Sequence, residues 1–211
     1  MKEIAALLLD IQAVKLSPNA PFTWASGWKS PIYCNNRKVL SYPIQRSKVV
    51  YALVKLIPEV IEIDAIIGVA TGAIAWGGLV ADELNLPFGY VRSEKKDHGL
   101  KTQIEGFESL GLKGKKVIVV EDLISTGGSS LKAVQVLREA GAEVIGMVAI
   151  FSYLFPQAEK AFAEAGVELK TITNYSELLE VALEQGFVKK EDTAWLAEWR
   201  KSPETWGQHQ N

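Results

Sequence analysis

The feature that most constrains this chain is residues 117–130, where an apolar run meets two carboxylates and then a small, glycine-rich turn. Val117–Val120 has the uninterrupted apolar character of a strand buried in a parallel sheet. Ser129–Glu139 follows with apolar residues at helical spacing. This order of strand, turn and helix predicts an α/β fold. Glu121 and Asp122 then lie at the carboxyl end of a strand, the edge where open α/β sheets bind ligands.

The turn itself has the chemistry of an anion site. Gly127 and Gly128 lack a Cβ, so the backbone can turn tightly and approach a ligand. Ser125, Thr126 and Ser129 carry hydroxyls, and the first turn of the following helix offers unpaired N–H groups. A phosphate cradle beside two carboxylates suits a phosphorylated sugar, because the acids can reach sugar hydroxyls or a magnesium ion.

Composition narrows the class of protein. The chain has 211 residues, enough for one α/β domain with a small appendage, and 48% of them are apolar. Its net charge of −2 predicts no general attraction to nucleic acid or acidic membranes. The single cysteine, Cys34, fits a reducing compartment and is expected to pack as a small hydrophobe rather than act as a nucleophile or metal ligand. Since no apolar run reaches the ~20 residues of a membrane span, a cytoplasmic protein is expected.

The hydrophobic pattern along the chain alternates between strands and helices. Strands are predicted at 65–69, 88–91, 116–120, 144–151 and 167–172. Helices are predicted at 3–14, 44–57, 72–85, 129–139, 156–165, 175–185 and 192–201. Residues 17–43, interrupted by prolines, predict an irregular or short-stranded flap. The alternation implies a central, mostly parallel sheet flanked by helices on both faces.

The 117–130 segment resembles the binding motif for phosphoribosyl diphosphate (PRPP) in the type I phosphoribosyltransferases. That motif is an apolar strand, an acidic pair, two apolar residues, then Thr/Ser-x-Gly-x-Thr/Ser. The resemblance implies that PRPP contacts Glu121, Asp122, Leu123, Ile124, Ser125, Thr126, Gly127, Gly128 and Ser129. It also implies a catalytic role for Asp122 and the fold of that family. The alternative is an ordinary strand–turn–helix junction in which Asp122 is a helix cap.

Residues 92–114 predict a long loop between two core strands, which in a compact domain is typical of a lid or a binding loop. Its spacing Arg-x3-Lys-Asp-His-Gly resembles the mobile catalytic loop of the orotate phosphoribosyltransferases. Arg92, Lys96 and His98 stand at the matching positions. The resemblance implies that all three bind PRPP, that Lys96 and His98 are catalytic, and that the loop of one subunit closes over its dimer partner's site. A lysine-rich surface loop without this role is the alternative.

Residues 21–33 resemble the N-terminal motif of the same enzymes, Phe-Thr-x2-Ser-Gly-x-Lys-Ser-Pro, which forms a hood over the pyrimidine. The resemblance implies that Lys29 and Ser125 lie near orotate. The chain departs from other members at Ala25, where they carry a lysine, and at residues 151–154, where some members have an Asp-Arg pair that grips orotate. An aromatic flap that only packs on the core is the alternative.

These resemblances imply a division into a helix and hood at 1–43 and a phosphoribosyltransferase core at 44–211 with C-terminal helices. They imply a pentosyltransferase that moves 5-phosphoribosyl from PRPP to orotate, giving orotidine 5′-phosphate and diphosphate in de novo pyrimidine (UMP) biosynthesis. Magnesium would bind mainly through PRPP and diphosphate, with no metal ligand set of the protein's own. A homodimer that binds neither nucleic acid nor membrane is expected.

Two other functions stay open. One is phosphoribosyl transfer to a different base, a purine or uracil. The other is a regulator that keeps the fold to sense PRPP while it binds nucleic acid, against which the net charge of −2 argues. A Rossmann dehydrogenase is poorly supported, because no Gly-x-Gly-x-x-Gly follows the first core strand.

Overall fold

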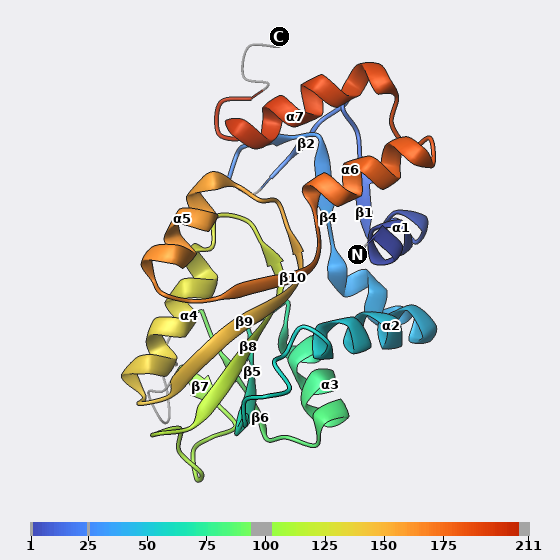
Figure 1. The fold of residues 1–211 in the computed structure, drawn as a ribbon. Coiled ribbons are helices and arrows are strands. Elements are labelled where there is room, and N and C mark those ends of the chain that lie inside the picture. The colour runs from blue at the N-terminus through green and yellow to red at the C-terminus, as the bar shows by residue number, and fades with distance from the viewer. Residues whose placement is uncertain (1, 25, 94–102, 207–211) are drawn as a thin grey trace.

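The computed structural model describes residues 2–24, 26–93 and 103–206 (Figure 1). Within them, a six-stranded sheet has the order β10-β9-β8-β5-β6-β7. Its strands are β5 (Ala65–Val69), β6 (Phe88–Val91), β7 (Ile104–Glu105), β8 (Lys116–Ile124), β9 (Glu143–Ser152) and β10 (Leu169–Asn174). All neighbours pair in parallel except β6 and β7. The predicted mostly parallel α/β sheet is therefore confirmed.

Helices cover both faces of this sheet (Figure 1). One face carries α4 (Gly128–Glu139) and α5 (Pro156–Glu164), and the other carries α1 (Lys2–Asp10), α2 (Pro43–Val54), α3 (Ile74–Leu84) and α6 (Tyr175–Glu184). Strand β8 shows why two cores form. Val117 and Val119 pack in the α4 and α5 cluster, whereas Ile118 and Val120 pack in the opposite one, because successive side chains of a strand alternate between faces.

The N-terminal segment forms two small sheets beyond the carboxyl edge of the main sheet. β1 (Val14–Leu16) pairs with β4 (Ile32–Cys34), and β2 (Phe22–Thr23) pairs with β3 (Lys29–Ser30), both antiparallel. A 3₁₀ helix η1 (Asn36–Ser41) leads from β4 to α2. At the other end of the chain η2 (Lys190–Asp192) precedes α7 (Thr193–Lys201), which lies beside β2 in Figure 1.

Three predicted boundaries are wrong in informative ways. The helix predicted at 3–14 ends at Asp10, because Gln12 adopts a left-handed φ of 54° and Val14 already belongs to β1. The strand predicted to stop at Val120 continues to Ile124, paired with β9, so the acidic pair lies inside the ladder. The loop predicted at 92–114 contains β7, which adds a short antiparallel strand to β6.

Helix α3 sits unusually close to β5, and glycines make this possible. A Cβ on Gly77 would lie 2.7 Å from Phe88 Cε2, and one on Gly68 would lie 2.7 Å from the Ala73 carbonyl oxygen. Because β5 and β8 pair in parallel, with Gly68 opposite Val120, the turn between β5 and α3 lies at the carboxyl end of β8.

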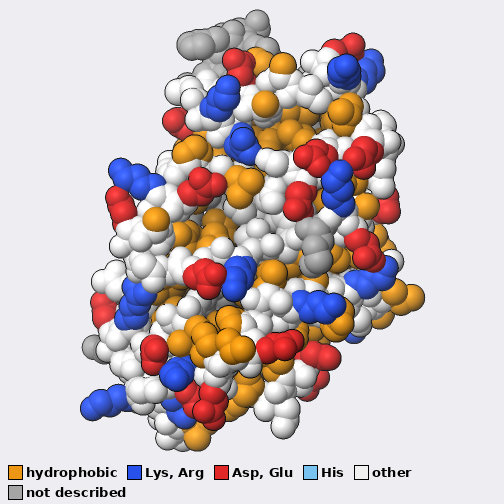
Figure 2. All heavy atoms as spheres, in the orientation of Figure 1, with side chains coloured by type: hydrophobic (Ala, Val, Ile, Leu, Met, Phe, Trp, Pro, Cys, Tyr) orange, Lys and Arg blue, Asp and Glu red, His pale blue; other side chains and the backbone are white. Residues whose placement is uncertain are grey.

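No helix among the described residues is long and apolar enough to cross a bilayer. On the face shown in Figure 2, acidic and basic side chains intermingle.

Candidate active site

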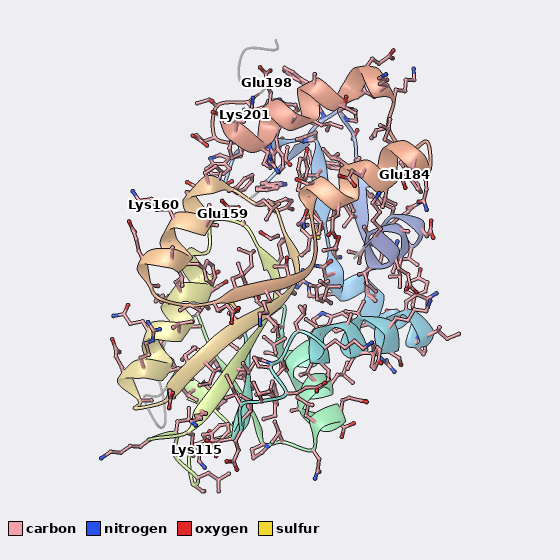
Figure 3. The ribbon with its side chains drawn as sticks, in the orientation of Figure 1. Lys115, Glu159, Lys160, Glu184, Glu198 and Lys201 are labelled. Carbon is pink, nitrogen blue, oxygen red and sulfur yellow. The ribbon has the colours of Figure 1, made fainter. Side chains whose placement is uncertain are left out.

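The site lies at the carboxyl ends of β5, β6 and β8, beside the N-terminal sheets. Lys115, which immediately precedes β8, lies at the opposite end of the molecule (Figure 3). This is the edge at which the sequence predicted the acidic pair to face a ligand.

Asp122 is held where three chain segments meet. A Cβ on Gly72, in the turn between β5 and α3, would collide with the Asp122 carboxylate. On the other side, the buried Asn36 donates through Nδ2 to the Asp122 carbonyl oxygen at 2.6 Å. Burial raises the pKa of Asp122, while a hydrogen bond with Glu121 and the positive charge of Arg37 oppose that rise. The carboxylate therefore faces the backbone of the β5–α3 turn.

Glu121 has a different environment. Only 5% of it is exposed, and its two oxygens accept hydrogen bonds from the Asp122 N–H at 3.0 Å and from Ser130 Oγ, on α4, at 2.9 Å. Burial raises the pKa of Glu121 to about 8, and the charge of Asp122 adds to the rise. Because two close, buried carboxylates resist joint ionisation, the pair binds a proton more tightly than two isolated, exposed carboxylates would.

The glycine-rich turn leads directly into helix α4 as predicted. Gly127 has a left-handed φ of 82°, and α4 begins at Gly128. The first backbone bond of the helix runs from the Leu131 N–H to the Gly127 carbonyl at 2.9 Å. The N–H groups of residues 128–130 precede this bond, so they are the donors that a helix N-terminus offers to an anion.

A cavity of about 300 Å³ opens beside this turn. Its lining consists of Thr23, Trp24, Tyr33, Cys34, Leu123, Ser125 and Tyr153. Lys29 lies at its rim, where Nζ donates to Thr23 Oγ1 at 2.9 Å. Of the two residues expected near orotate, Ser125 lines this cavity, whereas Lys29 only contacts the lining residue Thr23.

Cys34 packs against the core, as expected, and also lines this cavity. It is half-buried, and its Sγ donates to Asn36 Oδ1 at 3.3 Å. Burial raises the pKa of the Cys34 thiol far above its ordinary value, which disfavours the thiolate that a nucleophile needs.

Arg92 lies at a second hollow of about 160 Å³, between α4 and the ends of β5 and β6. Ala70, Ser93, Ser129 and Lys132 share its lining. Arg92 Nη1 lies 3.6 Å from Glu105 Oε1, so β7 helps to orient the guanidinium. The other two loop residues predicted to act on PRPP, Lys96 and His98, lie outside the described residues.

Sequence reasoning missed Asn36, Lys132 and Tyr153. Lys132 stands one helical turn after Ser129, a spacing that places both on one face of α4. Asn36 carried no such local signal, because it reaches the site through a contact between distant segments. Tyr153 belongs to residues 151–154, which the sequence marks only as a departure from the family's orotate-gripping pair, and its residue type did not indicate a role. In the described residues there is also no group of three His, Cys, Asp or Glu side chains that could hold a metal ion.

In this mostly parallel sheet, β8 ends in two carboxylates and is followed by a glycine-rich turn that begins α4, beside a cavity with aromatic walls. This combination is that of the phosphoribosyltransferase class of proteins. Residues 48–176 match the family described as "Phosphoribosyl transferase domain". Orotate phosphoribosyltransferase from Bacteroides fragilis is 60% identical, over 96% of this chain and 94% of its own length. The same enzyme from Porphyromonas gingivalis is 56% identical, over 98% of this chain and 97% of its own length. The chain therefore belongs to the orotate phosphoribosyltransferase family.

Solved structures agree on the fold. The crystal structure of orotate phosphoribosyltransferase from Aeropyrum pernix superposes with a TM-score of 0.75 at 31% identity, covering 88% of this chain and 99% of that one. The structure of UMP synthase from Leishmania donovani gives a TM-score of 0.76 at 26% identity, over 94% of this chain and 42% of that one.

Proposed function

We propose that the chain transfers a 5-phosphoribosyl group from PRPP to N1 of orotate, giving orotidine 5′-phosphate and diphosphate in the cytoplasmic synthesis of UMP. The observation that carries the proposal is that Ser125 belongs to two parts of the site. It lines the aromatic cavity and also opens the loop that ends in the donor N–H groups of α4. A base in the cavity and a sugar phosphate on the loop would therefore be neighbours.

Different residues bind different parts of PRPP. The hydroxyls and N–H groups from Ser125 to Ser129 hold the 5′-phosphate, and Asp122 holds ribose hydroxyls. Glu121, whose oxygens are engaged by Ser130 and the backbone, keeps Asp122 and α4 in place and reaches the ribose only if it rotates. The diphosphate extends toward the β5–α3 turn and the chain's own Arg92, which shares a hollow with Ser129, and this cation stabilises the leaving group. The family resemblance alone instead implies that Arg92, like Lys96 and His98, acts from the partner subunit.

Reaction at an anomeric carbon passes through a transition state with oxocarbenium character, so the enzyme must stabilise departing diphosphate and exclude water. Trp24 and Tyr153 wall the cavity that holds the base, and the proposed hood at residues 21–33 also supplies Thr23 and Tyr33 to its lining. The donor set fits magnesium carried by substrate, because Mg²⁺ takes one or two carboxylates plus phosphates and Asp122 offers one. When bound, the ion supplies charge neutralisation on the diphosphate.

The loop from Arg92 onward would complete the site. We propose that Lys96 and His98 act from the partner subunit of a homodimer, with Lys96 as the main electrostatic catalyst. Loss of one such contact typically lowers the rate about 10²–10³-fold.

Incubation with PRPP, Mg²⁺ and a panel of bases tests the proposal. Orotate, uracil, adenine and hypoxanthine are supplied separately, and the products are identified by mass spectrometry. We expect orotidine 5′-phosphate from orotate and its loss on chelation of Mg²⁺. A nucleotide formed preferentially from another base contradicts the choice of acceptor. No turnover together with tight nucleic-acid binding at physiological salt favours the regulator, although the mixed charges in Figure 2 offer no basic patch on that face.

A further inference from the structure

We propose that Tyr153 is a base-positioning and specificity residue, whose hydroxyl donates a hydrogen bond to an oxygen of the bound base. The inference rests on the proposed function, because it concerns how that reaction selects its acceptor. Tyr153 follows the end of β9 and lines the aromatic cavity together with Ser125, so a base there contacts both.

The Tyr153 ring is fixed by its surroundings. Only 2% of the residue is exposed. Four aromatic rings pack on it at centroid distances of 5.1 to 5.4 Å: Trp24, Phe151, Phe155 and Trp199. A ring held on several sides has one place for its hydroxyl, so a hydrogen bond from it costs little ordering when a ligand arrives.

A backbone hydrogen bond connects Tyr153 to the strand end that precedes the glycine-rich turn of residues 125–129, here called the phosphate loop. The Tyr153 N–H donates to the Ile124 carbonyl at 3.1 Å, directly before Ser125. The next residue, Leu154, has a left-handed φ of 56°, and its N–H donates to Ser152 Oγ at 3.0 Å. A non-glycine residue in this conformation is held there by its surroundings, as is typical of ligand sites. These contacts therefore hold Tyr153 at a fixed distance from the glycine-rich turn of residues 125–129.

Apart from Ser125, which is also expected to contact the base, the other polar side chains of the cavity are already bonded or largely exposed. Cys34 Sγ is engaged with Asn36, Thr23 Oγ1 accepts from Lys29, and Tyr33 is 45% exposed. Among the described residues, the Tyr153 hydroxyl has no hydrogen-bond partner. It is also not one of the fully buried polar atoms, so a ligand in the cavity can reach it. Burial raises the pKa of Tyr153 well above its ordinary value, so the hydroxyl keeps its proton and can donate.

Tyr153→Phe removes this hydroxyl and keeps the ring. Tyr175→Phe is the matched control, because Tyr175 is a second buried tyrosine that packs on Trp199, at 5.1 Å. Its hydroxyl donates to the Leu196 carbonyl at 2.9 Å, away from the cavity lining. KM for orotate and for PRPP, kcat with orotate and with uracil, and the melting temperature are measured for both variants and the wild type.

For Tyr153→Phe we expect KM for orotate to rise about ten-fold or more, with KM for PRPP within about two-fold and an undiminished melting temperature. Its preference for orotate over uracil should narrow, because the hydroxyl is proposed to bond a carboxylate oxygen of orotate, a group that uracil lacks. Tyr175→Phe should lower the melting temperature and leave both KM values unchanged. An unchanged KM for orotate in Tyr153→Phe overturns the inference, as does an equal rise in both KM values.

Failure of the proposed function has a separate outcome. If the wild type turns over another base instead of orotate, the function is wrong, and the role of Tyr153 is decided by KM for that base. If the wild type turns over none, both proposals fail.

Discussion

At the scale of single residues, Gly72 and Asp122 constrain each other. The carboxylate occupies the space that any side chain at residue 72 would need. Gly72 has no left-handed φ that would demand glycine, so contact with Asp122 is the reason for glycine here. The arrangement fixes the acid at the turn between β5 and α3, where ribose hydroxyls are proposed to bind.

Gly72→Ala should displace Asp122 and lower kcat/KM about 100-fold or more, because small misplacements of a positioning group cost about that much. The far-ultraviolet circular dichroism should stay unchanged. Gly78→Ala is the control, since its Cβ would make only ordinary contacts with Phe88, the nearest at 3.7 Å. It should keep full activity and add about 0.5–1 kcal/mol to the free energy of unfolding, as expected for removing a glycine from a helix interior. Full activity in Gly72→Ala contradicts the assignment of Asp122.

Glu121 gives a prediction for pH. The fold raises its pKa from 4.5 to about 8, so the folded state binds this proton more tightly than the unfolded state does. The stability from this proton is fully present below pH 4.5 and is lost as the pH rises to about 8. Glu121→Gln, which cannot ionise, should therefore gain melting temperature relative to the wild type as the pH rises through this window.

The control for this measurement is Glu159→Gln, which removes an exposed carboxylate on α5 (Figure 3). Its difference from the wild type should change little with pH over the same window. Parallel melting curves for the wild type and Glu121→Gln would show that Glu121 titrates as in the unfolded chain.

At the scale of elements, α7 supports the hood. Trp199 is fully buried, its Nε1 donates to the Lys29 carbonyl at 3.3 Å, and its ring meets Trp24 edge-on at 5.7 Å. The C-terminal helix thus fixes both the rim lysine and one wall of the base cavity. Residues at the two ends of the chain build one subsite.

Trp199→Phe should raise KM for orotate more than KM for PRPP, because it loosens the hood and leaves the phosphate loop untouched. It should also lower the free energy of unfolding by about 1–3 kcal/mol. Trp195→Phe, on the same helix but packed on Trp206 at 4.7 Å, should leave both KM values unchanged. Steady-state kinetics and urea unfolding measure the two effects, and equal changes in both KM values contradict the role of α7.

How far the sequence predicts the structure depends on whether a feature is local. The bounds of β5 and β6 match the prediction because each is a short apolar run with turn residues at its ends. The phosphate loop was likewise predictable, since one continuous motif builds it. The role of Asn36 was not, because it depends on a bond to a residue 86 positions away. The sequence marks residues 151–154 as a departure where some members grip orotate, but only the tertiary structure shows that Tyr153 lines the cavity.

At the scale of the whole molecule, the proposed homodimer shares its sites between subunits. Lys96→Ala and Asp122→Asn should each be nearly inactive alone. Mixed in equal amounts and allowed to exchange subunits, they should recover about a quarter of wild-type activity, since half the dimers then hold one intact site of two. Activity is followed as orotate loss against time after mixing. No recovery, with subunit exchange verified by mass spectrometry, contradicts sharing of the loop.

The central claim is that the turn after β8 holds the donor sugar phosphate next to a base cavity. A crystal structure with PRPP and Mg²⁺ tests it most directly. We predict the 5′-phosphate at the N–H groups that open α4, the ribose hydroxyls at Asp122, and the anomeric carbon facing the cavity lined by Ser125 and Tyr153. PRPP bound elsewhere, with this turn empty, would contradict the account.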